Sequence, residues 1–310
     1  MTQPPNAPPV VSGSPEPDRS VSRRAAGLAP RLVASGALVV AAVTFLLWFG
    51  PRPTPVYADV YVPLARAAGF LAPPPGGAHV RMSTALVNGQ VFKYIVGQSK
   101  LNLETVLKHY EEQFQTTETT SGTRLRTARR LNGKGAGVVT GILRGPVTHP
   151  QDVNADALEF ARTTRLGALG QFHVIAAYAS QGTVFIDFMP ADDVRLDQLF
   201  PKGKEDAPGS DLEGVRRPAG LQRFLTIEHG SGQSLSRTRI YRAENSVAAV
   251  AEFGGALAAG GWKPNTAFDS SVVRHFTYGQ RDCLVGGASE GRDAFVILVD
   301  RYVTGLGQQP

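Results

Sequence analysis

The longest apolar stretch of the chain runs from Leu32 to Phe49 and contains no charged residue and no proline. It lies in an uncharged window between Arg31 and Arg52. A helix rises about 1.5 Å per residue, so this window reaches roughly across the ~30 Å hydrocarbon core of a bilayer. A buried helix of a soluble core would be shorter and would have a polar face. The pattern therefore predicts a single transmembrane helix over residues 32–50.

Basic residues on either side of this helix predict its orientation. Four arginines precede it within the first 31 residues, whereas after Arg52 the next basic residue is Arg66. Basic flanks remain on the cytoplasmic side of a membrane. We therefore expect a single-pass protein of the cell inner membrane, with a cytoplasmic N-terminus and an extracytoplasmic C-terminal part. The alternative is a secreted protein cleaved near Ala58, because small residues precede Asp59 as they do at signal-peptide sites.

Beyond the Pro- and Gly-rich residues 73–77, the pattern is that of a folded domain. Residues 80–96 are extended, with a turn at Asn88–Gly89–Gln90. After Asn102, a residue type that caps helices, apolar side chains recur at the spacing of one helix face. These apolar positions are Leu103, Val106, Leu107, Tyr110 and Phe114. The sequence thus predicts a strand pair followed by one amphipathic helix.

The second half of the chain repeats this outline. Residues 225–241 are extended around a turn at Ser231–Gly232–Gln233. A helix capped by Asn245 or Ser246 follows and ends at Gly260–Gly261. Both halves close on a hairpin with a similar small-residue turn, at residues 179–182 and 288–291. Repetition of this kind indicates duplicated structural units. The predicted fold class is α+β, with an N-terminal single transmembrane helix followed by two repeated units, each an antiparallel sheet covered by one main helix.

The pattern divides the chain into seven predicted segments. They are a disordered Pro-rich cytoplasmic tail (1–31), the transmembrane helix (32–50), a membrane-proximal linker (51–78), a first α+β unit with an insertion (79–200), a linker (201–220), a second α+β unit (221–303) and a flexible tail (304–310). Composition defines the tails and linkers, because segments rich in Pro, Ser and Gly cannot bury enough apolar surface to fold.

Charge and cysteine content narrow the possible functions of the outer part. The chain of 310 residues has a net charge of +6, but residues 53–310 carry 27 basic and 24 acidic side chains. This near balance argues against nucleic-acid binding, which needs a concentrated basic surface. Cys283 is the single cysteine, so no internal disulfide can form. Its apolar surroundings predict a buried thiol, and an intermolecular disulfide or a nucleophile is the alternative.

One basic run in the first half is a candidate binding site. Residues 124–134 contain five basic residues and no acidic residue. They are Arg124, Arg126, Arg129, Arg130 and Lys134. Such a run can contact an anionic lipid, a glycan or a partner surface, at about 1 kcal/mol per charge near a charged membrane. It can also be a strand edge that basic side chains protect from aggregation.

No pattern in the sequence indicates a catalytic, cofactor or metal site. The six histidines are scattered, and none is spaced with another histidine, a cysteine or an acid as in zinc sites. The sequence contains no G-x-S-x-G or H-E-x-x-H motif. The glycines of residues 133–137 precede a strand-like run, whereas a phosphate loop precedes a helix. Asp187 interrupts an apolar strand and is expected to face water, since a buried carboxylate needs a partner.

These features predict a non-enzymatic, single-pass, membrane-anchored extracytoplasmic protein that acts as a protein-binding or scaffold component of an envelope assembly. Its expected partners are the membrane, through Leu32–Phe49, and an extracytoplasmic protein; no cofactor and no nucleic acid are expected. The alternative function is an extracytoplasmic ligand-binding or sensing module for lipid, glycan or peptide, which would use the cleft between the two units. A membrane-anchored enzyme is the third reading.

Overall fold

A computed structural model describes residues 64–115, 129–133, 135–143, 150–179, 181–199, 205–231, 234–266, 273–290 and 293–303. The predicted transmembrane helix over residues 32–50 lies outside these ranges. Within them, no helix combines the length and the apolar character needed to cross a membrane.

Among the described residues, the first half of the chain forms six strands and most of the helices. Its elements are β1 (Gly77–Val87), β2 (Gln90–Ser99), α3 (Leu103–Gln115), β3 (Arg129–Gly133), β4 (Ala136–Leu143), α4 (Pro150–Thr163), the 3-10 turn η1 (Leu166–Ala168), β5 (Gln171–Ala179), β6 (Thr183–Pro190) and α5 (Leu196–Leu199).

The second half forms six further strands and one helix. Its elements are β7 (Gln222–Ser231), β8 (Ser234–Ala243), α6 (Ser246–Ala259), β9 (Lys263–Pro264), β10 (Val273–Tyr278), β11 (Arg281–Glu290) and β12 (Asp293–Val303). The main helices of both halves begin at the predicted asparagine caps. The Asn102 side chain accepts the Thr105 N–H at 2.8 Å, and the Asn245 side chain accepts the Ala248 N–H at 3.0 Å.

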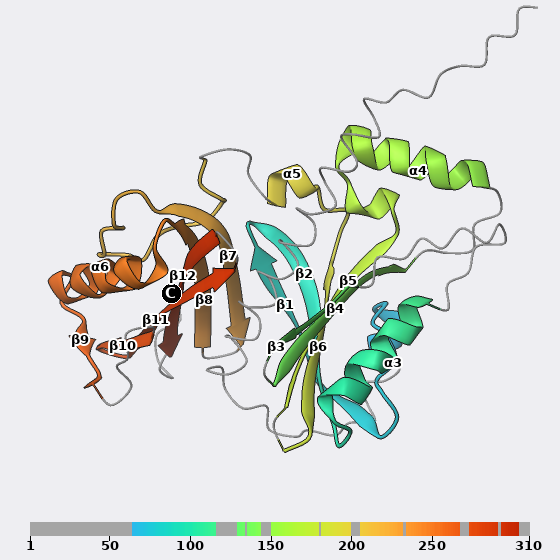
Figure 1. Cartoon of the computed structure of the whole chain (residues 1–310), viewed down its shortest axis with the longest axis horizontal. Coiled ribbons are helices and arrows are strands. Elements are labelled where there is room, and N and C mark those ends of the chain that lie inside the picture. Colours follow the sequence, from blue (N-terminus) through green and yellow to red (C-terminus); the bar gives the residue numbers. More distant parts are fainter. Residues whose placement is uncertain are drawn as a thin grey trace, which may run out of the picture.

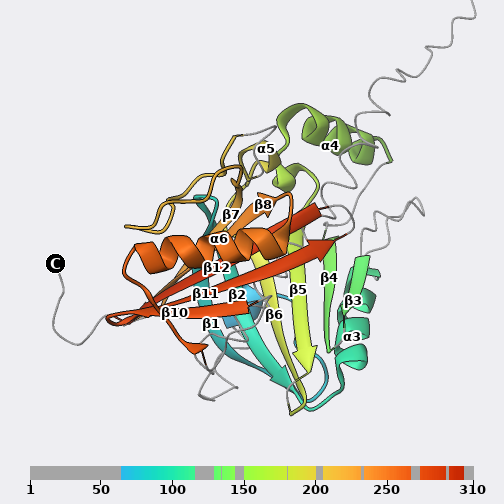
Figure 2. The same ribbon diagram turned by 60° about the vertical axis from the view of Figure 1, so that its left-hand side comes forward.

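All twelve strands belong to one sheet, in the order β3-β4-β5-β6-β2-β1-β7-β8-β12-β11-β10-β9 (Figures 1 and 2). Every named strand pair is antiparallel. Each half has the same internal order: a hairpin, then a helix, then four strands whose last member returns to the second strand of the hairpin. This return places β6 beside β2 and β12 beside β8.

The predicted fold class, with a separate sheet in each of two units, is wrong. Strands β1 and β7 pair through Leu86 with Glu228 and Val87 with Ile227, and this joins the halves into one sheet. The physical reason is that β1 and β7 would otherwise be open edges, whose unpaired backbone groups need partners. The first half also departs from one main helix per sheet, because α4, η1 and α5 are added to α3.

Helices α3 and α6 cover the same face of the sheet. Residues paired directly across neighbouring strands have their side chains on the same face of the sheet. Such pairs can be followed from Ile175 on β5 through Asp187 on β6 and Ile95 on β2, and then across β1, β7, β8 and β12, to Cys283 on β11. Ile175 packs in the cluster beneath α3, and Cys283 packs in the cluster beneath α6. In Figure 2, α6 lies across β11 and β12.

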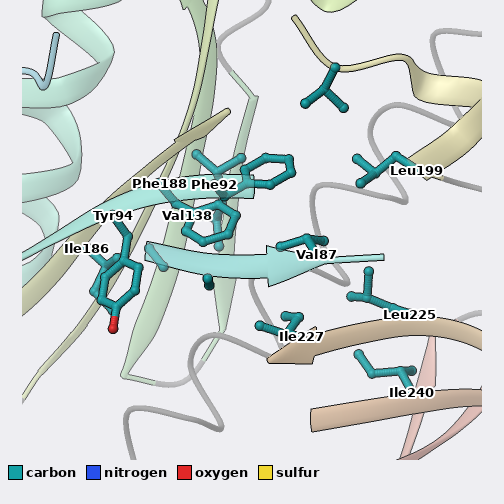
Figure 3. Packing of buried hydrophobic residues seen from close by; sticks show 14 of the residues in the cluster. Val87, Phe92, Tyr94, Val138, Ile186, Phe188, Leu199, Leu225, Ile227 and Ile240 are labelled. Carbon is teal, nitrogen blue, oxygen red and sulfur yellow. The ribbon is translucent and has the colours of Figure 1, made fainter. Parts of the chain in front are cut away.

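The largest apolar core lies on the opposite face and draws on both halves. It includes Val87 and Phe188 from the first half and Leu225, Ile227 and Ile240 from the second (Figure 3). Residues of α4, η1 and α5 complete it, through Phe160, Leu166 and Leu199. Because this cluster crosses the β1–β7 junction, apolar packing stabilises the junction as well as each half.

The turn between β1 and β2 locks the junction through one polar side chain. Asn88 is buried and adopts the left-handed conformation, with φ of 47°. Its backbone N–H donates to the Thr226 carbonyl at 2.8 Å, and its side-chain oxygen accepts the Thr226 N–H at 2.7 Å. Its side-chain amide donates to the carbonyls of Leu199 and Phe224. Asn88 therefore connects the first hairpin to both β7 and α5.

The segment before β7 is not the solvated linker that its composition predicts. Within the described residues 205–221, Ala207, Leu212 and Val215 are buried, and two of them join the core beneath α6. The Ala207 N–H donates to the Arg223 carbonyl at 2.7 Å. The segment therefore packs against the sheet of the second half.

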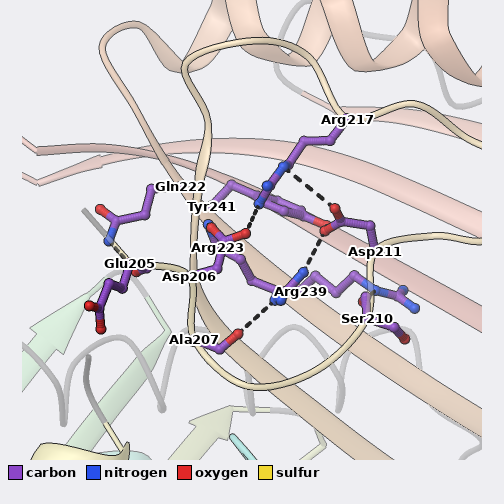
Figure 4. A network of polar contacts seen from close by, with 10 residues as sticks. All are labelled: Glu205, Asp206, Ala207, Ser210, Asp211, Arg217, Gln222, Arg223, Arg239 and Tyr241. Atoms are coloured by element: carbon purple, nitrogen blue, oxygen red, sulfur yellow. Dashed lines mark hydrogen bonds and ion pairs between the residues drawn. The ribbon is translucent and has the colours of Figure 1, made fainter. Parts of the chain in front are cut away.

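Charged residues of this segment pair with Arg223 of strand β7 and with one another (Figure 4). Asp211 accepts from Arg223 at 2.7 Å and from the Tyr241 hydroxyl at 3.1 Å. Arg217 forms ion pairs with Asp206 at 2.7 Å and with Asp211 at 3.5 Å. Asp206 and Asp211 therefore help to hold the segment against the sheet.

Candidate functional site

The predicted anionic-surface contact falls largely outside the described residues. Arg124, Arg126 and Lys134 lie outside them, and Arg129 and Arg130 lie on β3, where only the backbone is described. Strand β3 is one edge of the sheet, which is the position that the alternative interpretation of this run requires. Contact with an anionic surface stays a prediction.

Asp187 is buried, contrary to the expectation that it faces water. Its Oδ1 atom lies 2.8 Å from Nδ1 of His173, and both side chains are 0% exposed. Its Oδ2 atom accepts the Leu71 N–H at 2.9 Å. Strand β6 is buried on both faces, because α3 covers one side and the large core lies on the other. Side chains of β6 alternate between two buried faces, so alternation of polar and apolar residues does not mark a side of this strand that faces solvent.

Two further titratable side chains lie in the same buried region. Tyr110 on α3 and His79 on β1 are fully or almost fully buried. Burial raises the pKa of Tyr110 well above its ordinary value, and the Asp187 charge adds to this. Burial also lowers the pKa of His79, and the Asp187 charge opposes this decrease. Among the described residues, the Tyr110 hydroxyl and both His79 nitrogens have no hydrogen-bond partner.

This buried group resembles an acid–base site in residue type but not in accessibility. A general acid or base must come within hydrogen-bond reach of a substrate. His79, Tyr110, His173 and Asp187 are each no more than 1% exposed. We therefore assign them to the packing of α3 rather than to chemistry. In the described part of the chain, no group of three or more histidine, cysteine, aspartate or glutamate side chains could hold a metal ion.

An exposed aromatic group lies on the sheet beyond the end of α6. Tyr278, Arg281 and Tyr302 are direct cross-strand partners on β10, β11 and β12, so their side chains share one face of the sheet. Tyr278 is 51% exposed and Tyr302 is 37% exposed. Trp262, which follows the glycines that end α6, packs beside Tyr278 with ring centroids 5.5 Å apart. Trp262 itself is buried, at 4% exposed, and supports the exposed residues from beneath. We call these four residues the aromatic–arginine surface.

Arg281 is held rigidly within this surface. Its guanidinium lies 5.3 Å from the centroid of the Trp262 ring. Its Nε and Nη2 atoms donate to the two carboxylate oxygens of Asp300, at 3.3 and 2.9 Å. A two-point contact with a buried carboxylate fixes the orientation of the guanidinium and satisfies its charge. The surface is therefore preorganised and offers aromatic rings and hydroxyls rather than an unpaired positive charge.

Reasoning from the sequence did not identify this surface. Tyr278 and Tyr302 are 24 positions apart, and their proximity depends on the registers of two successive hairpins. A signal was present in the turn at Gly279, whose φ of 57° suits glycine and which joins β10 to β11. That turn pairs Tyr278 with Arg281, but nothing local places Tyr302 beside them.

Cys283 is buried beneath α6, as its apolar surroundings predict. Burial is the main cause that raises the pKa of its thiol, and the Asp300 charge adds to the increase. Because only the thiolate reacts readily, we expect a maleimide to label the folded chain at least about a hundredfold more slowly than the chain in denaturant. Mass spectrometry of timed labelling reactions at pH 7 measures the two rates. Equal rates would contradict this assignment.

Comparisons with known proteins yield little. A scan against models of protein families finds no match, and a search of curated proteins finds none either. A search of solved structures finds "Crystal structure of MucB in complex with MucA(peri)", at 10% sequence identity, covering 80% of this chain and 94% of that chain with a TM-score of 0.18. A likeness with so low a TM-score carries no argument about fold or function.

Proposed function

We propose that the chain is a non-enzymatic, single-pass membrane protein whose extracytoplasmic part binds another protein through the aromatic–arginine surface. The apolar run Leu32–Phe49 and its basic N-terminal flank support the anchor and its orientation. The observation that carries the binding function is the exposed pair Tyr278 and Tyr302 on either side of a fixed arginine.

The residue types of this surface are those on which protein interfaces depend. Tyrosine and arginine are among the residue types enriched at the few positions that supply most binding energy. Tyrosine adds a large contact area with few side-chain torsions to order, and its hydroxyl forms hydrogen bonds at the edge of the contact. Rigid side chains also reduce the entropy lost on association.

The charge state of the surface favours a protein over an anionic ligand. Asp300 already satisfies the Arg281 guanidinium through two hydrogen bonds. A phosphate or a lipid headgroup would have to compete with this carboxylate for the same donors. The exposed rings of Tyr278 and Tyr302 are free of that competition and suit apolar and peptide groups.

The test is recovery of a partner with the intact chain after cross-linking in cells and purification in mild detergent. We expect the double variant Tyr278→Ser and Tyr302→Ser to reduce recovery of a specific protein at least about tenfold, because loss of one hot-spot contact costs roughly 2 kcal/mol. The matched control is Leu158→Ser with Val247→Ser, which changes two side chains of similar exposure on α4 and α6, at 56% and 52%. Equal loss with both double variants, or a chain that is reproducibly recovered alone, contradicts the proposal.

A further inference from the structure

The first described residues, 64–76, form a segment that lies against the sheet and α3 and leads into β1; we call it the proximal segment (Figure 1). It begins with a helical turn, and Ala65 and Phe70 pack on Ile95 and Met189. Leu71 joins the core beneath α3. The proximal segment therefore covers part of the sheet face on which α3 lies.

Side chains make the polar contacts that hold the proximal segment. The Ala72 carbonyl accepts from Gln113 at 3.0 Å and lies 3.2 Å from Nε2 of His109. The Gly69 carbonyl accepts from Gln171 at 3.3 Å, and the Leu71 N–H donates to Asp187. In the described residues, no backbone ladder joins this segment to a strand. Its attachment is consequently weaker than that of the twelve strands.

A buried histidine without hydrogen-bond partners lies on β1, just after this segment. His79 follows it by three residues, is 1% exposed, and packs its ring edge-on against Phe185 at 6.0 Å. Phe185 and Leu71 belong to the same apolar cluster. A charged imidazolium at this place would need water or an acceptor that the closed arrangement does not supply.

The other titratable groups around His79 do not remove this conflict. Asp187 on β6 is already engaged by His173 on β5 and by the Leu71 N–H. Tyr110 on α3 is buried and uncharged at neutral pH, since burial raises its pKa. Lys93 lies on β2, two positions before Ile95. Arg66 belongs to the proximal segment and is exposed. His109 lies on the outer side of α3, where its ring contacts the Ala72 carbonyl.

The sign of the pH effect follows from burial. The pKa of His79 is lowered in the closed arrangement, and its ordinary value of 6.5 returns once water reaches the ring. The open form therefore binds more protons than the closed form below that pH. The closed form is fully stable above about pH 6.5 and loses stability as the pH falls below it.

We propose that the proximal segment is an acid-released strap: protonation of His79 shifts its equilibrium toward a form detached from the sheet as the pH falls below about 6.5. Detachment removes Leu71 from the cluster that contains Phe185, the ring against which His79 packs, and so admits water toward His79. It also breaks the Leu71–Asp187 hydrogen bond while the twelve-stranded sheet stays folded. The 13 residues of the segment then add up to about 45 Å to the reach of the chain. The added distance from a membrane depends on the proposed transmembrane anchor. The detachment of the strap does not depend on it.

Hydrogen–deuterium exchange of the full chain in detergent micelles tests the strap. Exchange of a peptide that includes Leu71 is compared at pH 7.5 and 5.5, after correction for the intrinsic pH dependence of exchange. We expect protection of this peptide to fall measurably at pH 5.5, by up to about tenfold, which is the limit that uptake of one proton by a group of ordinary pKa 6.5 sets over this range. Peptides of β11 and β12 should keep their protection at both values.

Two non-titrating variants, His79→Leu and His79→Gln, should abolish the pH dependence; the use of both guards against a variant that does not fold. The matched control is His275→Gln, which changes a histidine of the second half that pairs with Asp282 and should leave the pH dependence intact. Three results overturn the proposal: unchanged protection at pH 5.5, simultaneous loss of protection in β11 and β12, and a wild-type response in the folded His79 variants. Each is independent of whether a partner protein binds to Tyr278 and Tyr302.

Discussion

Replacing Asp187 with alanine is expected to lower the free energy of unfolding by about 3–5 kcal/mol. The change removes the acceptor for the buried His173 ring and for the Leu71 N–H. Neither donor can turn to water, because His173 is fully buried and Leu71 is nearly so. Urea denaturation followed by circular dichroism measures the effect.

A matched control separates burial from the mere loss of an ion pair. Glu228 and Arg237 pair at 3.3 Å on the same sheet face, but their side chains are partly exposed. Glu228→Ala should therefore cost less than about 1 kcal/mol. Equal effects of the two substitutions would show that the His173–Asp187 pair is accessible to water in solution.

Replacing Asn88 with alanine is expected to cost about 3–5 kcal/mol. Three backbone groups, on Leu199, Phe224 and Thr226, each lose a hydrogen bond to this buried side chain. Alanine is also disfavoured at the positive φ of this turn, by about 1 kcal/mol. Thermal and urea unfolding of the variant measure the total.

Glycine at the same position divides the cost into its parts. Asn88→Gly tolerates the backbone conformation and loses only the side-chain hydrogen bonds, so it should cost about 2–3 kcal/mol. The matched control is Gln181→Gly, at an exposed turn residue with a similar φ of 45°, which should change stability by less than about 1 kcal/mol. A near-neutral Asn88→Gly would show that the side chain does not hold the junction.

Local features of the fold could be predicted from the sequence because their causes are local. The apolar spacing after Asn102 and the cap itself correspond to α3, which spans Leu103–Gln115. The second helix likewise begins beside Asn245 and ends before Gly260. The turn at Asn88–Gly89 joins β1 to β2 as predicted.

The errors concern interactions between residues far apart in the chain. Nothing near Leu86 or Val87 in the sequence indicates that β1 pairs with β7, because only two residue pairs form that contact. The burial of Asp187 depends on His173, 14 positions away, and on a helix that covers its face. Composition alone made residues 201–220 look like a linker, since it cannot show that Asp211 contacts Arg223 and Tyr241.

The candidate site was missed for the same reason. The sequence predicted a site at the basic run of residues 124–134, because its basic residues are close together in the chain. The aromatic–arginine surface instead collects single residues from β10, β11, β12 and the end of α6. A pair of hairpin registers is needed to place them together, and periodicity within one strand does not supply it.

The narrow join between β1 and β7 has a mechanical consequence. A pull applied between the N-terminal and C-terminal sides of the folded chain crosses a seam with only two paired positions, whereas β1 and β2 share ten. Resistance to separation of the halves comes from the hydrogen bonds of Asn88 and from the apolar packing across the seam. Apolar packing of this kind is lost after a short displacement. Under tension the two halves should part from each other before either one unravels.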